Sequence, residues 1–487
     1  MTVFGTNIFE ADKLFKQKQY QEARKAYSAS VKLGSPHAFY QLGTIYHQGL
    51  DVVKDPISSY IWFSLAAEYN FNDAQQVSDK IYQLLSKKSQ EQSQKLLTSL
   101  KQNLGKSVIN QRYFPLLNQE LLNEKVTFGG AGKLEVNYQD FELILDSFDT
   151  NFESNIADDA GENDPFFIDE DDPFAEEDSN PAFQRPTNTM ARKVPFLIVD
   201  YDVGPDGSIR NVRKVQEIGY SRTILETFVF STFPAPNFKE NRINFLNRSY
   251  IGSAFYSKFR MKEENELLFD RVRRHAKKLK KSNQFNDQYQ YAMMLCTFTW
   301  LEQEKGEAEQ RLKNLAEQGH PFAQYEYGAK LYREQTDIQQ GIHWISQASK
   351  YGLAKAEYLL ATILLHSPWV QQDEKKALFW FESAIKQDHQ AAKLQATALK
   401  LLAIDSSLHD IPGAIVYLTE LEDSQINNPE YYFLLSVSHK NRENRNFREV
   451  IRYIEKAIDL GEKYNWDVGY WQGLLEKWTT GSVYIVE

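Results

Sequence analysis

Carboxylates are the most concentrated reactive groups in this 487-residue sequence. Residues 134–184 contain 17 Asp and Glu and no Lys or Arg. Oxygen ligands at this density could bind calcium, but the ordered spacing and the required glycine of an EF-hand loop are missing. A solvated linker is the simplest interpretation, because so polar a stretch cannot bury enough apolar surface to offset its ordering entropy.

The acidic stretch also repeats a short phrase that raises a docking hypothesis. Asp-Pro-Phe occurs at residues 164–166 and again at residues 172–174. Aromatic side chains flanked by acids could anchor the segment on a partner surface while the acids steer association. This hypothesis assigns the contacts to Phe166, Phe167, Asp172 and Phe174. The partner surface could belong to another protein or to this chain.

Basic residues crowd residues 258–281. On a helix most of them would share one face, for which we predict Arg271, Arg274, Lys277, Lys278 and Lys281. Since the whole chain carries −10, residues outside the acidic stretch carry a net +7. The alternatives are a solvated face, pairing with the acidic stretch, and nucleic-acid binding. We expect no nucleic-acid partner, because the overall charge is acidic and no aromatic stacking pattern accompanies the cations.

Catalytic and cofactor motifs are missing from the sequence. It has no phosphate loop, no glycine fingerprint after a strand, no nucleophile elbow and no paired-histidine zinc helix. The nine histidines are scattered, and we interpret His320, His343 and His366 as solvated or capping residues. The sequence therefore predicts no catalytic residue, no metal and no cofactor. An enzyme with a site between two lobes is the minor alternative.

Compartment is only weakly indicated. Cys296 is the single cysteine, so an intrachain disulfide and a cysteine zinc site are excluded, and it should be a small buried residue. No stretch reaches the ~20 apolar residues of a membrane span. The start, MTVFGTNIFEADKLF, lacks the charged and apolar regions of a signal peptide. These features fit the cytoplasm, although cysteine poverty fits many periplasmic proteins too.

The sequence contains internal repeats of 33–36 residues. Their opening alanines are Ala38, Ala323 and Ala356, with a degenerate start at Ala392, and further small or large apolar residues follow them on the same helical face. The second helices carry Trp62, Trp344 and Trp380. Two antiparallel helices with two turns need this length, and small residues let the helices approach closely. Gly34, Gly319 and Gly352 each stand four residues before an alanine, where a helix C-cap needs a left-handed residue.

These repeat segments resemble Sel1-like repeats, which are related to tetratricopeptide repeats. Helices near both ends of the chain, around Tyr27 and Ile454, resemble the second helix of a tetratricopeptide repeat. The resemblance implies an α-solenoid that binds protein or peptide partners.

The middle of the chain changes period. Leu197, Val199, Tyr201 and Val203 alternate with Ile198, Asp200 and Asp202, and an Asp-Gly turn at residues 206–207 leads to a second β-prone run. This pattern is typical of a β-hairpin. A helix ending near Pro234 and a last β-prone run follow. This order, with the matching residues Gly207, Ile209, Val212, Val215 and Phe233, resembles the C-terminal domain of TonB-type energy transducers.

We therefore predict a mainly α protein, an α-solenoid of helix-turn-helix repeats in two blocks with an α+β module between them. The predicted parts are N-terminal repeats (1–118), a mixed β-prone and acidic segment (119–189), the TonB C-terminal-like module (190–260) and C-terminal repeats (261–487). The predicted function is a non-catalytic protein-interaction scaffold. The TonB-type resemblance implies a bacterial periplasmic accessory of an envelope transport system, and a cytoplasmic adaptor is the alternative.

Overall fold

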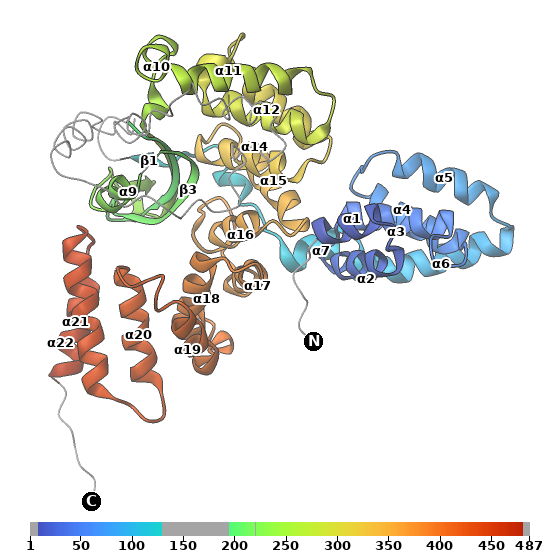
Figure 1. Cartoon of the computed structure of the whole chain (residues 1–487). Coiled ribbons are helices and arrows are strands. Elements are labelled where there is room, and N and C mark those ends of the chain that lie inside the picture. Colours follow the sequence, from blue (N-terminus) through green and yellow to red (C-terminus); the bar gives the residue numbers. More distant parts are fainter. Residues whose placement is uncertain (1–7, 129–193, 220, 481–487) are drawn as a thin grey trace, which may run out of the picture. The chain divides into compact units, whose positions relative to one another are not determined.

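The computed structural model describes residues 8–128, 194–219 and 221–480. The chain divides into two compact units, and Figure 1 labels their helices and strands. Unit 1 comprises Met1–Val126, Phe238–Ile243 and Gly306–Glu487, and unit 2 comprises Thr127–Asn237 and Asn244–Lys305. The two ends of the sequence therefore belong to one unit, and most of the middle forms the other. The four-part division predicted from the sequence, with boundaries at 118, 189 and 260, stays a prediction.

Unit 1 begins with paired helices. Their bounds are α1 Ile8–Lys16, α2 Tyr20–Ser30, α3 Pro36–Gln48, α4 Pro56–Ala67, α5 Ala74–Leu84, α6 Lys87–Leu104 and α7 Lys106–Tyr113. Sequence-local signals set these ends. Gly34 is left-handed (φ +65°), as predicted. The Asp55 carboxylate caps α4 by accepting hydrogen bonds from the backbone amides of Ile57 and Ser58.

The second stretch of unit 1 continues the helical pairs. Its helices are α13 Glu307–Glu317, α14 Pro321–Arg333, α15 Ile338–Lys350, α16 Ala354–His366, α17 Glu374–Ile385, α18 Gln390–Leu402, α19 Ile411–Glu420, α20 Pro429–Asn441, α21 Phe447–Lys463 and α22 Gly469–Thr479. The repeat-opening alanines Ala323, Ala356 and Ala392 are fully buried. Two are held by histidine caps, since His320 Nδ1 and His389 Nδ1 accept from the amides of Ala323 and Ala392.

Small residues let the repeat helices touch, as predicted. A Cβ atom on Gly328 would lie 2.9 Å from the carbonyl oxygen of Gly341, so α14 and α15 meet backbone to backbone. A Cβ on Gly43 would lie 2.9 Å from the ring of Phe63, which fixes α3 against α4. Larger residues at these glycines would separate the helices and open the packed core.

The segment after α7 joins the two stretches of unit 1. The Trp380 indole donates to the carbonyl of Tyr113 (2.6 Å), and the Trp369 indole donates to the carbonyl of Glu124 (2.9 Å). Backbone bonds run both ways nearby, one of them from the Gln371 amide to the carbonyl of Leu116 (2.8 Å). Residues 113–124 thus contact residues of the α16–α17 pair that lie 245 to 267 positions later in the chain.

Unit 2 contains a three-stranded antiparallel sheet with the order β3-β2-β6. Its elements are β2 Phe196–Val203, β3 Ile209–Ile218, α9 Arg222–Phe228 and β6 Phe245–Gly252. The predicted alternation is confirmed, because Leu197, Val199, Tyr201 and Val203 share one core with α9. Gly207 in the predicted turn has φ +84°, and its Cα lies so close to the Phe233 carbonyl that a side chain would collide.

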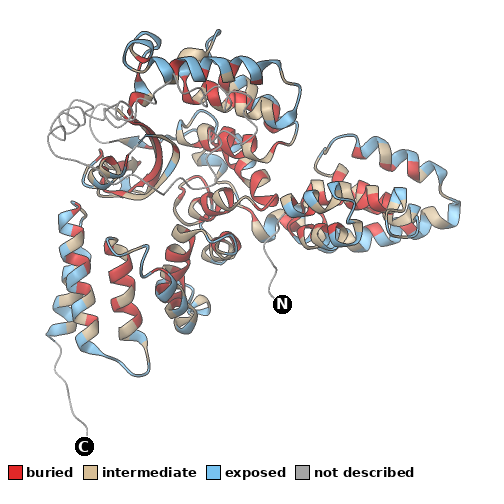
Figure 2. Ribbon diagram, viewed as in Figure 1, coloured by how far each residue is buried: buried red, intermediate tan, exposed pale blue. Residues whose placement is uncertain are grey.

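Three helices complete unit 2: α10 Lys258–Glu264, α11 Glu266–Lys281 and α12 Phe285–Thr297. Helix α11 packs on α12 through its buried residues, Phe269, Val272, Ala276 and Leu279. Buried and exposed residues accordingly alternate along it at helical spacing (Figure 2). Short strands elsewhere are β1 Thr127–Phe128, β4 Pro236–Phe238 and β5 Asn241–Arg242. No helix in the described ranges is both long and apolar enough to cross a bilayer.

Candidate interaction surfaces

The predicted basic residues lie on the exposed side of α11. Arg271, Arg274 and Lys278 follow Leu267 at steps of four, three and four, so the four side chains form one stripe along the helix. All four are exposed, and the buried side of α11 faces the opposite way. Lys277 and Lys281 are also exposed and lie beside this stripe. These exposed positions are compatible with the predicted basic face, whose role stays a prediction.

The α11 cations have no carboxylate partner among the described residues. Ion pairs form elsewhere in unit 2, for example between Arg260 Nε and Glu264 Oε1 of α10 at 2.7 Å. No such pair involves Arg271, Arg274, Lys277, Lys278 or Lys281 in the ranges 8–128, 194–219 and 221–480. Helix α11 carries seven basic residues against Glu266 and Asp270, so its outer side is strongly positive.

Apolar side chains are exposed near both ends of α11. Phe259 on α10 is 77% exposed, and Leu267 in the first turn of α11 is 57% exposed. Phe285 opens α12, just beyond the other end of α11, and is 42% exposed. Exposed apolar residues near the two ends of a cationic helix are typical of a surface that binds another chain. These flanking residues were not predicted from the sequence, because a single apolar residue near a helix end is as often buried as exposed.

The predicted docking segment, Phe166, Phe167, Asp172 and Phe174, lies outside the described residues. Its role stays a prediction.

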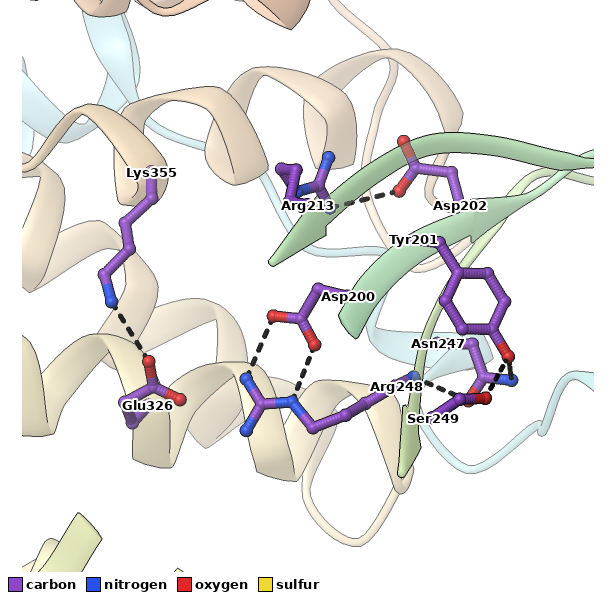
Figure 3. Close-up of polar contacts among 9 residues, drawn as sticks. All are labelled: Asp200, Tyr201, Asp202, Arg213, Asn247, Arg248, Ser249, Glu326 and Lys355. Carbon is purple, nitrogen blue, oxygen red and sulfur yellow. Dashed lines mark hydrogen bonds and ion pairs between the residues drawn. The ribbon is translucent and has the colours of Figure 1, made fainter. Parts of the chain in front are cut away.

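Charges on the sheet of unit 2 are paired. Arg248 Nε and Nη2 donate to the two carboxylate oxygens of Asp200 at 2.6 and 2.9 Å, and both side chains are only 8% exposed (Figure 3). Asp202 faces Arg213 at 3.5 Å on the same sheet. The bidentate geometry fixes the register of β2 against β6. The alternation in the sequence assigned Asp200 and Asp202 to one face of the sheet. Arg213 and Arg248, on neighbouring strands, could have indicated that these carboxylates are paired.

The hydroxyl of Tyr201 is held from the neighbouring strand. It lies 2.9 Å from Ser249 Oγ and accepts from Asn247 Nδ2 at 2.8 Å (Figure 3). Tyr201 is fully buried in the core of unit 2, so these two bonds satisfy its polar end. The group is therefore part of the core rather than a reactive hydroxyl.

Two carboxylates are buried within the repeats of unit 1. Glu326 on α14 accepts from Lys355 on α16 at 3.1 Å (Figure 3). Glu357 is fully buried and accepts from Ser383 Oγ at 2.8 Å and from Gln387 Nε2 at 3.3 Å. Burial raises the pKa of Glu357 to about 8, so it is mostly protonated at neutral pH. Glu326 thus connects the first helices of two successive repeats, and Glu357 connects the two helices of one repeat.

Lys350 at the end of α15 is a buried cation, and no carboxylate among the described residues pairs with it. Its Nζ lies over the rings of Tyr69 (4.3 Å) and Phe114 (4.7 Å), which come from the first stretch of unit 1. Burial, with a smaller effect of Lys106, lowers the pKa of Lys350 to about 7. Burial also raises the pKa of Tyr69, whose hydroxyl finds no hydrogen-bond partner within residues 8–128, 194–219 and 221–480. A lysine with so low a pKa could act as a base or nucleophile, yet its neighbours are two rings and another cation.

The histidines and the cysteine take structural places. His320 caps α14, and burial lowers its pKa to about 4, so it accepts a hydrogen bond in its neutral form. The capping interpretation of His320 is therefore confirmed. His343 is exposed on α15, in line with the solvated interpretation; its ring lies beside Trp344, and partial desolvation with the nearby Lys350 lowers its pKa. Cys296 is half-buried in α12 rather than fully buried. No group of three metal-ligating side chains was found in the described part of the chain.

Comparison with known proteins identifies the repeats. Residues 36–68, 321–352 and 354–389 match the Sel1 repeat, and they correspond to the pairs α3–α4, α14–α15 and α16–α17. The Sel1-like resemblance of these three segments is thus confirmed, and unit 1 contains three Sel1 repeats. The TonB-type resemblance of residues 190–260 stays a prediction.

Two solved structures are similar to the chain. One is a Sel1 repeat protein from Oxalobacter formigenes, 16% identical, covering 42% of this chain and 84% of its own, with a TM-score of 0.32. The other is a protective antigen of uropathogenic Escherichia coli strains that displays an SLR fold. It is 16% identical, covers 96% of this chain and 84% of its own, and has a TM-score of 0.31. No curated protein matches the sequence.

Proposed function

We propose, from its three Sel1 repeats, that this chain is a non-catalytic scaffold that holds protein partners. Repeats of this type stack helical pairs and present extended surfaces to other proteins. In unit 1 the first repeat and the later two are fastened together by the segment that follows α7. The scaffold therefore offers more than one repeat surface within a single compact unit.

The outer side of α11 is the observation that carries this proposal. The helix uses its apolar side to pack on α12, so the fold does not require Arg271, Arg274 or Lys278 to be charged. Exposed cations beside exposed apolar residues fit an acidic protein surface, because charge steers the encounter and apolar contact supplies affinity. We assign partner binding to this side of unit 2.

A finer proposal concerns residues 190–260. Their order of β2, Asp-Gly turn, β3, α9 and β6 supports a TonB C-terminal-like module. Such a module would accept a partner strand at a sheet edge by β-augmentation. It would make the chain an accessory of a bacterial envelope transport system and place it in the periplasm. A cytoplasmic adaptor is the alternative, and fractionation of the native cells separates the two.

A comparative pull-down from native extract tests the scaffold proposal. The tested variant replaces Arg271, Arg274 and Lys278 by Gln in the intact chain. The matched control replaces Lys87, Lys88 and Lys95, three exposed lysines of α6, by Gln. We expect the wild type and the α6 control to enrich the same proteins and the α11 variant to lose them. If no protein is enriched by any version, the scaffold proposal is wrong.

A further inference from the structure

We propose that the outer side of α11, with Phe259, Leu267 and Phe285 at its ends, is a docking site for residues 164–174 of this same chain. The site is defined by described residues of unit 2, and its occupant by the sequence. The inference goes beyond scaffold function, because it assigns the surface an internal ligand that an external partner must displace.

Helix α11 and residues 164–174 carry opposite charges. Helix α11 presents seven basic residues against two acidic ones. Residues 164–174, with the sequence DPFFIDEDDPF, contain five acidic residues and no basic residue. The acidic stretch of 134–184 and the cationic side of α11 are the two largest charge imbalances along the chain. Opposite charges in such numbers attract across a Debye length of about 8 Å at physiological salt.

The apolar residues match as well. The segment carries Phe166, Phe167 and Phe174, and the surface exposes Phe259, Leu267 and Phe285. Eight residues separate Phe166 from Phe174, which in an extended chain is about 27 Å. The 16-residue helix α11 is about 24 Å long. Aromatic residues at the two ends of the segment could therefore reach the apolar residues at the two ends of the helix, with the acids over the cations between them.

The connection of the segment to the rest of the chain favours docking within one molecule. The residues on either side, Phe128 at the end of β1 and Val194 just before β2, both belong to unit 2, as does α11. Twenty residues separate Phe174 from Val194, a maximal reach of about 70 Å. A tether of this length gives the segment a high effective concentration at α11, which a separate copy at micromolar concentration cannot match.

Zero-length carbodiimide cross-linking of the full-length chain tests the proposal. The reagent joins amines to carboxylates in contact, and Lys277, Lys278 and Lys281 provide amines at the site. Mixing ¹⁴N- and ¹⁵N-labelled chains separates links within one copy from links between copies. We expect links within one copy from these lysines to residues 164–172. Their yield should be at least about fivefold above that of the α6 lysines Lys87, Lys88 and Lys95, and should fall at 1 M salt.

Two variants separate the contribution of apolar contact to docking from the contribution of charge. Replacing Phe166, Phe167 and Phe174 by Ser keeps every charge and should lower the yield about tenfold, since each ~1.4 kcal/mol of lost contact is a factor of ten. Replacing Arg271 and Arg274 by Gln keeps every reactive amine and should lower the yield about threefold, as expected for two exposed ion pairs. An unchanged yield in both variants would overturn the proposal, as would equal labelling of the α6 lysines.

The cross-linking experiment and the pull-down can fail independently of each other. Links between labelled and unlabelled copies would overturn docking within one molecule and identify a second copy as the occupant. Absence of any α11 link to residues 164–172 would overturn the inference. In that case partner capture through α11 in the pull-down would still stand on its own.

Discussion

In the repeats of unit 1, Lys350 and Glu357 are buried among rings and hydroxyls, and their pKa values are displaced toward the neutral forms. On α11 of unit 2, Arg271, Arg274 and Lys278 stand in solvent without a carboxylate among the described residues. Charges of the first kind cost stability and hold neighbouring elements in a defined arrangement. Charges of the second kind contribute little to folding and remain available for recognition. Substitutions in the two regions should therefore separate stability from binding.

The largest effect is expected where a buried pair is broken. Asp200→Asn leaves the Arg248 guanidinium buried without its carboxylate, which should cost about 3 kcal/mol of unfolding free energy. Urea unfolding measures this. The control is Arg222→Gln, which breaks the exposed Arg222–Glu226 pair and should cost less than about 0.5 kcal/mol. If both substitutions lower the unfolding free energy equally, the buried pair contributes no more to stability than the exposed pair.

Lys350→Met should stabilise unit 1. The folded pKa of about 7 lies below the ordinary value of 10.5, so folding disfavours the proton that Lys350 carries in the unfolded chain. The wild-type chain therefore gains stability as pH rises from 7 to 10.5. We expect the Met variant to have an unfolding free energy roughly 3 kcal/mol higher than that of the wild type at pH 7 and below. This gain is smaller than the pKa shift alone implies, because Met loses the cation–π contacts, and it should fade toward pH 10.5. Thermal unfolding across pH checks this, and a gain independent of pH would contradict it.

Glu357→Gln should act with the opposite pH dependence. The folded pKa of about 8 lies above the ordinary 4.5, so the wild-type chain loses stability as pH rises from 4.5 to 8. Gln mimics the protonated acid and retains the bond from Ser383. We expect no gain at pH 4 and a gain of about 1–2 kcal/mol at pH 9. Urea midpoints at the two pH values test this, and a loss of stability in the Gln variant at pH 9 would show that the fold favours the ionised carboxylate of Glu357, contrary to its raised pKa.

The smallest effect on stability is expected on α11. Replacing Arg271, Arg274 and Lys278 by Gln removes no ion pair among the described residues and leaves the packing on α12 intact. The melting temperature should match that of the α6 control variant within about 1 °C, because surface substitutions away from special contacts stay within about 0.5 kcal/mol. A clear fall in melting temperature would mean that the cations serve the fold.

Local pattern was sufficient to predict the repeats and the hairpin. Ala323 and Ala356 are fully buried because their small side chains and helical spacing require a close neighbour, and Gly207 has the backbone angle that its turn demands. Contacts across the chain could not be predicted in this way. Tyr113 and Trp380 are 267 residues apart, and nothing in the spacing of either indicates the other. The same is true of Lys350 and Tyr69, since a lysine at a helix end ordinarily suggests a solvated site.

The candidate site was predicted in part. The helical spacing of the basic residues gave their common side on α11, because amphipathic periodicity is a local property. The flanking Phe259, Leu267 and Phe285 were not recognised, since exposure of an apolar side chain depends on the packing of α10, α11 and α12 together.

The salt dependence of partner capture shows whether the cations of α11 hold the partner. Partner retention by the intact chain is measured from 0.05 to 0.5 M salt for the wild type and for the variant with Gln at Arg271, Arg274 and Lys278. If the cations of α11 hold the partner, wild-type retention falls steeply with salt, and the variant starts low and changes little. Superimposable curves for the two chains at every salt concentration would contradict the assignment of partner binding to α11.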